Sequence, residues 1–319
     1  MKTAFLLLLA LAGGAAAARA QSLPFHRPLN PMAAGRSALA HQPFAVFSPG
    51  KSRLTATFEY GNAIEYDRLV TEPTTYLLDA EFMRASLAYR RELNPATFVT
   101  VRGEVRGAYA GFADDFFVWY HDLIGFSQPE RAARPINAWG SQLALPNGVR
   151  VVREPAPFGL GDFEATIGFR HSLTQQTALT VTLPTATNAQ FGRGTVAVAA
   201  VHTLRVPLIS RVTFEGSLGA GLTPRHGALA EYQRTLFLSG STGLRLRLWG
   251  GQSAYGFFYY HSPYYAGTTF RSLDRPELSG EFGWISRARD GSEWRVGFTE
   301  DIAPGDMAID LVLKIGRSW

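Results

Sequence analysis

Apolar and polar residues alternate along most of the chain from residue 51 onward, the pattern of β-strands with two different faces. In residues 53–60 the apolar positions are Leu54, Ala56, Phe58 and Tyr60. The same alternation is clear in residues 98–106, 162–170, 212–222, 236–248, 278–284, 294–298 and 307–315. Less regular strands fit at residues 76–91, 176–186, 193–206 and 253–262. Helical periodicity is nearly absent, so the pattern predicts an all-β chain of about twelve strands.

The connections between these strands alternate between short and long. Short ones occur around Asn94-Pro95, Gln175-Gln176, Pro207, Gly250-Gly251 and Asp290-Gly291. The others span residues 61–75, 110–160, 187–192, 223–231 and 263–275, with only 302–306 brief. Outer-membrane barrels have an even strand number, short periplasmic turns and longer extracellular loops. The spacing therefore predicts a transmembrane antiparallel β-barrel of the bacterial outer-membrane type over residues 51–319, with a long extracellular loop at residues 110–160.

A soluble barrel or sandwich would instead turn its apolar face inward. Three features favour the membrane barrel: the length of the chain, full charges of both signs on the polar faces, and aromatic residues near strand ends, where interfacial girdles belong. Those aromatic residues are Tyr60, Tyr76, Trp249, Tyr255, Trp294 and Trp319. A closed barrel satisfies every backbone group in lipid without a spanning helix.

The N-terminus predicts export. Residues 1–20 combine Lys2, an apolar stretch over residues 4–12 and the small-residue ending Ala18-Arg19-Ala20, the parts of a signal peptide. A short spanning anchor is the alternative, but the apolar run is too short for one. Residues 21–50 contain five prolines without periodicity and predict an extended segment that either hangs in the periplasm or enters the barrel.

The final strand carries a feature of outer-membrane barrels, which generally end in an aromatic residue that the assembly machinery reads. Trp319 ends the chain, with Ile309, Leu311, Leu313 and Ile315 in phase behind it. Arg317 interrupts that pattern at an apolar position.

Composition restricts the function classes. The chain is 46% hydrophobic and 13% aromatic, which excludes a disordered protein, and it has no Cys for a disulfide framework. Loss of Lys2 and Arg19 with the signal peptide lowers the net charge from +5 to +3, too small an excess to indicate nucleic-acid binding. No cofactor motif is present.

Charged residues on the polar strand faces are predicted to line the lumen. They are Arg102, Glu104, Arg106, Asp162, Glu164, Arg170, Glu215, Arg245, Arg247, Glu277, Glu281, Glu293, Arg295, Asp310 and Lys314. Such residues either tune solute selectivity in a pore or neutralise one another and fill a narrow barrel. The near balance of signs favours filling.

The long loop contains a predicted amphipathic helix. Phe112, Phe116, Trp119, Tyr120 and Leu123 share one helical face, which would rest on the membrane interface or cap the pore. Asp114, Asp115, His121 and Asp122 include a single His, so solvated loop charge is the expectation and no metal site is predicted.

Catalytic motifs are lacking, with one weak candidate. His261 and Ser262 are faintly similar to the His and Ser region of outer-membrane lipid A deacylases, in which one residue separates the two. Adjacent residues face opposite sides of a strand, so His261 is not expected to activate Ser262. The sequence predicts a protein that is not an enzyme.

Several short motifs resemble the bacterial family of domain of unknown function 3187. They are Trp119-Tyr120-His121-Asp122 with Arg131 and Arg134-Pro135, Leu78-Asp79-Ala80-Glu81, Gly159-Leu160-Gly161-Asp162, and Phe298-Thr299-Glu300-Asp301. Phe126-Ser127-Gln128 departs from the pattern, where a Leu-Pro-type turn would be expected. The resemblance implies a Gram-negative outer-membrane barrel and no particular activity.

The function predicted first is a narrow channel for small polar solutes in the outer membrane. Its partners would be outer-membrane lipid, the assembly machinery and the solutes. A plugged structural or assembly-linked barrel is the alternative, and a lipid-acting acyl hydrolase is the third reading.

Overall fold

A computed structural model describes residues 35–36, 44, 49–68, 75–125, 131, 134–302 and 309–319. The predicted signal peptide and most of the predicted extended segment lie outside these residues, so both stay predictions.

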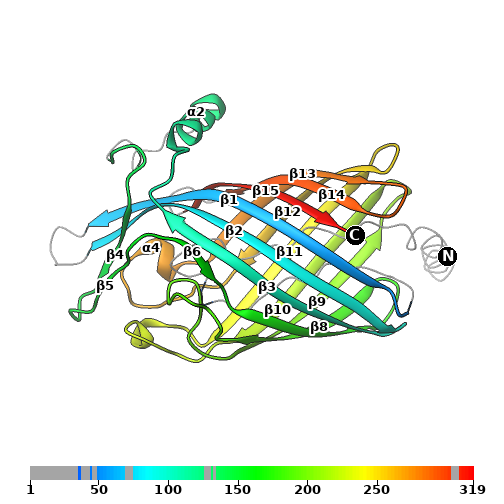
Figure 1. The fold of residues 1–319 in the computed structure, drawn as a ribbon, viewed down its shortest axis with the longest axis horizontal. Coiled ribbons are helices and arrows are strands. Elements are labelled where there is room, and N and C mark those ends of the chain that lie inside the picture. The colour runs from blue at the N-terminus through cyan, green and yellow to red at the C-terminus, as the bar shows by residue number, and fades with distance from the viewer. Residues whose placement is uncertain are drawn as a thin grey trace, which may run out of the picture.

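Twelve antiparallel strands form a closed barrel (Figure 1). They are β1 (Ser52–Arg68), β2 (Thr75–Asn94), β3 (Thr97–Tyr109), β7 (Phe163–Arg170), β8 (Gln175–Leu183), β9 (Ala197–Pro207), β10 (Val212–Leu222), β11 (Leu236–Arg247), β12 (Gln252–His261), β13 (Glu277–Arg287), β14 (Glu293–Asp301) and β15 (Ile309–Ser318). Each pairs with its sequence neighbours, and β15 closes the ring on β1 with Phe58 opposite Ile315. The predicted strand number and all-β class are confirmed.

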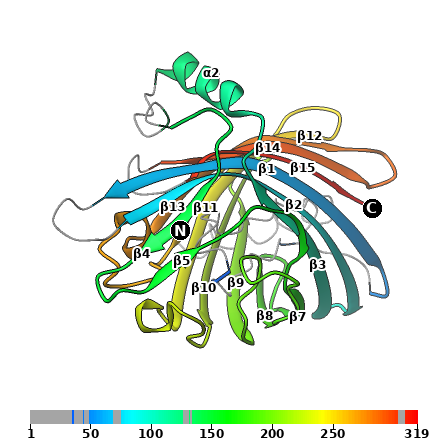
Figure 2. The same ribbon diagram turned by 60° about the vertical axis from the view of Figure 1, so that its left-hand side comes forward.

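The tight turns gather at one end of the barrel and the long connections at the other (Figure 1). We call these the turn end and the loop end; in outer-membrane barrels they are the periplasmic and extracellular ends, respectively. The C-terminus lies at the turn end. Figure 2 brings the loop end forward and shows the helix α2 (Asp114–Ile124) outside the wall, beside β1 and β15.

The connection between β3 and β7 contains more regular structure than predicted. Besides α2 it holds β4 (Gly140–Ala144), β5 (Arg150–Val152) and β6 (Ala156–Leu160). β4 pairs with the loop end of β2, and β6 pairs with the loop end of β3, where Val105 lies opposite Leu160. β6 continues the line of β7 along β3 and is therefore part of the wall. The predicted loop at 110–160 thus includes residues that belong to the barrel.

Two short helices complete the loop end. They are η1 (Ala230–Tyr232), between β10 and β11, and α4 (Arg271–Asp274), between β12 and β13. No helix in the described part of the chain is long and apolar enough to cross a membrane.

The two barrel faces differ in the sense predicted for a membrane barrel. Outward-facing Leu87, Leu244 and Val296 are 52%, 48% and 56% exposed. Inward-facing Glu215 and Glu281, by contrast, are 1% and 0% exposed. An apolar exterior around a charged interior is the reverse of a soluble barrel, so the soluble alternative is wrong.

Aromatic side chains form a partial girdle at the turn end. Trp249, Trp294 and Trp319 are exposed there, and Arg317 lies between two of them, with its guanidinium 5.0 Å from the Trp294 ring and 5.1 Å from the Trp319 ring. This cation–π contact explains why an arginine interrupts the apolar phase of β15. Two predicted girdle residues face inward instead: Tyr76 is fully buried and Tyr255 is nearly so.

Candidate functional site

Most predicted lumen charges lie on the inner face and are buried. They are Arg102, Glu104, Arg106, Asp162, Glu164, Arg170, Glu215, Arg245, Glu277, Glu281, Glu293 and Arg295. The Lys314 side chain is 9% exposed. Arg247 differs: it shares the inward phase of β11, but it is exposed at the turn end and donates to the Ser210 carbonyl at 2.8 Å. The side chain of Asp310 lies outside the described residues.

Ion pairs join these side chains along the inner face of the wall, either within one strand or between strands that are neighbours or next neighbours in the sheet. Glu164 accepts from Arg102 at 3.3 Å, Glu281 accepts from Lys314 at 2.7 Å, and Glu104 pairs with Arg106. Further partners were not among the predicted site residues: Arg53 pairs with Glu293 at 3.0 Å, Arg170 with Glu92 at 2.8 Å, Arg205 with Glu215 at 3.5 Å, and Arg84 with Glu59. The alternation of apolar and polar residues in the strands indicates the inward position of all these partners. Together they place paired charge where a bore would run.

Aromatic rings occupy further lumen space opposite glycines. Tyr255 lies opposite Gly283, and a Cβ added at Gly283 would meet the Tyr255 hydroxyl at 2.5 Å. Phe98 and Phe257 are set against Gly168 and Gly243 in the same way. The absence of a side chain on the partner strand lets each ring lie flat across the wall.

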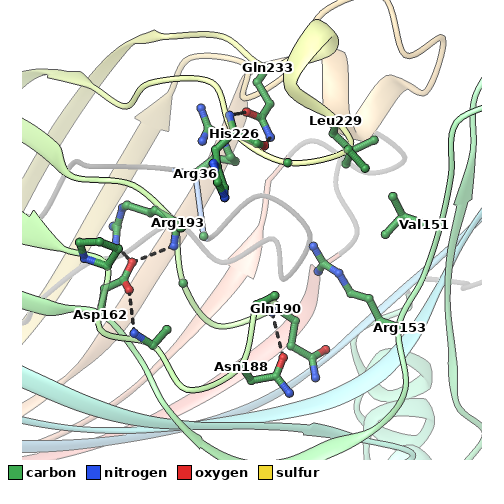
Figure 3. A pocket seen from close by; sticks show the side chains of 18 of the residues that line it. Arg36, Val151, Arg153, Asp162, Asn188, Gln190, Arg193, His226, Leu229 and Gln233 are labelled. Carbon is green, nitrogen blue, oxygen red and sulfur yellow. Dashed lines mark hydrogen bonds and ion pairs between the residues drawn. The ribbon is translucent and has the colours of Figure 1, made fainter.

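A cavity of about 560 Å³ opens at the loop end (Figure 3). We call it the vestibule. Its lining comes from the connections that follow β5, β8, β10 and β12, together with Gly35 and Arg36. Arg153 reaches into it from one side, and Arg36 and Arg193 lie on the other side. Asp162, in the kink between β6 and β7, accepts from the Arg193 backbone N–H at 2.8 Å and from its Nη1 at 3.2 Å.

The described residues of the N-terminal segment contact the barrel at two levels. Arg36 donates to the carbonyls of Thr223 and Pro224, at 3.1 and 3.0 Å, just beyond the loop end of β10. Phe44 is 1% exposed, and its carbonyl accepts from Arg205 Nη1 at 3.2 Å, close to the turn end of β9. Phe44 therefore lies inside the barrel, beside Arg205.

Outside the wall, α2 covers carboxylates that face away from the lumen. Asp79 and Glu81 share the phase of the exposed residues Leu87 and Tyr89 on β2, yet each is 1% exposed. Asp79 accepts from Arg131 at 3.1 Å and from Arg134 at 2.9 Å. Glu81 accepts from the Ala113 backbone N–H at 2.6 Å and from the Tyr60 hydroxyl.

A third outward carboxylate completes this arrangement, which we call the outer cap: residues 111–125, Arg131 and Arg134 over Asp79, Glu81 and Glu300. Glu300 of β14 lies 3.3 Å from His121 Nε2 and 3.4 Å from the Tyr120 hydroxyl. Phe117, Asp114 and His121 form the buried side of α2, whereas Phe112, Phe116, Trp119 and Leu123 are exposed. Asp122 of the loop signature is also exposed.

The cap residues do not form a metal site. Asp114 bonds Arg131 at 2.8 Å and the Asn137 backbone N–H at 2.6 Å, and burial raises its pKa. Among the described residues no group of three potential ligands is placed to hold a metal ion.

His261 and Ser262 do not form a nucleophile pair. His261 Nδ1 lies 2.6 Å from the Ser262 carbonyl, and its ring stacks on Tyr264 at 4.2 Å. The Ser262 hydroxyl instead accepts from the Leu238 backbone N–H at 2.9 Å.

The family model for proteins of unknown function DUF3187 matches residues 15–319. The chain belongs to this family. The outer cap thus joins three of the motifs that carried the resemblance: Asp79 and Glu81, the α2 sequence with Arg131 and Arg134, and Glu300. No significant match was found among curated proteins.

Solved structures share the barrel fold. The COG4313 outer-membrane channel from Pseudomonas putida F1 aligns with a TM-score of 0.54 at 11% identity, covering 85% of this chain and 96% of that one. A FadL homologue from Pseudomonas aeruginosa aligns with a TM-score of 0.41 at 9% identity, covering 93% and 99%. The first of these likenesses shows a fold found in an outer-membrane channel and says nothing of a solute.

Proposed function

We propose that this protein is a narrow outer-membrane channel for small polar solutes, closed in the described state and opened by movement within the lumen. The observation that carries the proposal is the division of the lumen: a solute-sized vestibule at the loop end lies above a region filled with paired charges.

The vestibule has the size and lining of a solute site. Its volume of about 560 Å³ falls within the range of small-molecule pockets, roughly 300–1,000 Å³. Charged and amide side chains converge on it from four separate connections, which is how loops on a rigid barrel build binding sites.

Closure would come from two elements below the vestibule. The first is the set of lumen ion pairs, in which Lys314 bridges Glu281 at 2.7 Å and Glu59 at 3.6 Å. The second is Phe44, whose carbonyl accepts from Arg205. The lumen pairs are made by side chains, so they can rearrange while the backbone ladder of the wall stays intact.

The test is single-channel recording of the purified protein in planar bilayers, beside a variant in which residues 37–48 are deleted. Discrete conductance steps in the native chain, enlarged by the deletion, are expected. Absence of steps in both proteins would contradict channel function. Because the deletion leaves β1 to β15 intact, heat-dependent gel mobility serves as the folding control.

A plugged structural barrel is the second candidate, favoured by the burial of Phe44 and of the lumen charges. In that case the deletion variant would remain silent in bilayers, and cells carrying it would show unchanged leakiness to a large antibiotic. The acyl hydrolase reading predicts loss of activity on lipid substrates in His261→Ala. The contacts of His261 and Ser262 give it no support.

The proposal includes location and assembly. Residues 1–20 would direct export, and Trp319, exposed at the end of β15, would be read by the assembly machinery. Fractionation that finds the protein soluble in the periplasm would contradict both.

A further inference from the structure

We infer that the vestibule binds small organic anions, specifically carboxylates with an apolar body. The inference rests on the proposed channel function, because it names the solute class that such a channel would admit.

The first argument is a contrast between two sets of arginines. In the lumen below, Arg53, Arg102 and Arg170 each meet a carboxylate within 3.3 Å. At the vestibule, Arg36 and Arg153 meet none among the described residues. Arg36 is 5% exposed and its guanidinium bonds only neutral carbonyls, with Nε left without a partner. A buried charge without a counter-charge is costly, so an anion that pairs with Arg36 would lower that cost.

The second argument is that neighbouring acidic groups are not available to neutralise these arginines. Asp162 is saturated by the backbone N–H groups of Ala186 and Arg193 and by the Arg193 side chain. Glu154, the other acidic residue of the lining, is exposed. Residues 21–50, which supply Arg36, contain Arg27 as well and no Asp or Glu. Burial lowers the pKa of both Arg36 and Arg153, a cost that a bound anion would relieve.

The rest of the lining defines the kind of anion. Val151, Leu229 and Tyr265 give the cavity apolar walls. Asn188 and Gln190 line the cavity together, and the Gln190 backbone N–H donates to Asn188 Oδ1 at 3.0 Å (Figure 3). A carboxylate paired with Arg153 or with Arg36, and with an apolar body along Leu229 or Tyr265, would satisfy both kinds of surface. A fully hydrated inorganic anion would leave the apolar walls unused.

Isothermal titration of the full chain in detergent micelles tests the inference with three probes of similar size: the anion benzoate, its neutral isostere benzamide and the cation benzylamine. Benzoate is expected to bind at least about tenfold more tightly than benzamide, the value of one charge-assisted hydrogen bond. Benzylamine is expected not to bind. Arg153→Gln should weaken benzoate binding about tenfold, whereas Arg150→Gln, an exposed arginine of the same connection, should leave it unchanged.

Equal binding of benzoate and benzamide, or benzoate binding that ignores Arg153→Gln, overturns the inference. Should Arg153→Gln lose its heat-dependent gel mobility, Arg36→Gln provides the same comparison from the opposite wall. Planar-bilayer recording separates this result from channel function. A conducting protein that does not bind benzoate keeps the channel and refutes the anion site. A protein that binds benzoate without conducting keeps the anion site and refutes the channel.

Discussion

Paired charges occur on both sides of the barrel wall, and the two groups differ in what surrounds them. Lumen pairs such as Lys314 with Glu281 lie among other charged groups, in a space that water would enter in the proposed open state. The outer-cap pairs, such as Arg131 with Asp79, lie between the wall and α2, on the side that carries the apolar exterior. Loss of a partner inside is therefore relieved by water, whereas loss of a partner outside leaves a charge among protein and lipid.

The outer cap also explains why carboxylates occupy outward positions of the strands. Asp79, Glu81 and Glu300 occupy outward positions in strands whose other outward residues are apolar. Such residues require a cover that supplies donors. Here the cover is a helix from a connection whose own exposed face is again apolar.

The largest effect is expected for Arg131→Met, which removes the cation shared by Asp79 and Asp114. Leaving two buried carboxylates without it should cost about 3–5 kcal/mol of unfolding free energy. Urea unfolding in lipid vesicles, followed by tryptophan fluorescence, measures the loss. Arg150→Met, an exposed arginine of the same connection, is the control and should change little.

A smaller loss is expected for Lys314→Met in the lumen, about 1–3 kcal/mol, because water can enter beside Glu281 and Glu59. The same variant should raise the conductance in planar bilayers, since a cation on the inner face of the wall is gone. A stability loss equal to that of Arg131→Met would contradict the expected difference between the lumen and the outer cap.

The exposed face of α2 is expected to lie in the outer leaflet. This expectation tests whether the outer-cap pairs lie beside lipid, and it needs no change in stability. The chain has no Cys, so a single spin label can be placed by Trp119→Cys, near the centre of the exposed side of α2, or by Asp122→Cys, at the charged edge of that side. Collision with oxygen should exceed collision with a water-soluble nickel complex at position 119, and the order should reverse at position 122. The same order at both positions would show that α2 does not lie in lipid.

The smallest effect is expected for Arg317→Gln, an outward arginine that contacts rings in place of carboxylates. Loss of its cation–π contacts should cost about 0.5–1 kcal/mol. Urea unfolding of this variant and of the turn variant Arg289→Gln measures the difference in unfolding free energy. A loss above that of Lys314→Met would mean that the girdle holds this charge more strongly than the lumen does.

Alternation alone predicts the wall and most of its inner charges. Val296, Leu244 and Leu87 are outward as their phase requires, and Glu215 and Glu281 are inward. The partners Arg84 and Arg205 follow from the same phase, although they were not selected as site residues. Tyr76 and Tyr255 were misplaced because nearness to a strand end does not say which face an aromatic ring takes.

The alternation of apolar and polar residues does not predict the vestibule or the outer cap. Arg36 and Arg153 line one cavity although they lie more than a hundred positions apart in the chain, and their role depends on which carboxylates the described residues place nearby. The helix of the cap was predicted, but its attachment to Asp79 and Glu300 depends on strand register, which short motifs do not encode. Only the outward phase of those carboxylates signalled that something must cover them.

The rings set against glycines have a consequence for how the barrel is built. Tyr255, Gly283 and Gly297 lie in one cross-strand row over β12, β13 and β14. A two-residue slip keeps every side chain on its own face, so hydrophobicity alone does not forbid it. In this barrel such a slip would bring Glu281 or Ile285 against the Tyr255 ring in place of Gly283. The glycines opposite the rings therefore favour the observed register of these strands over the registers two residues away.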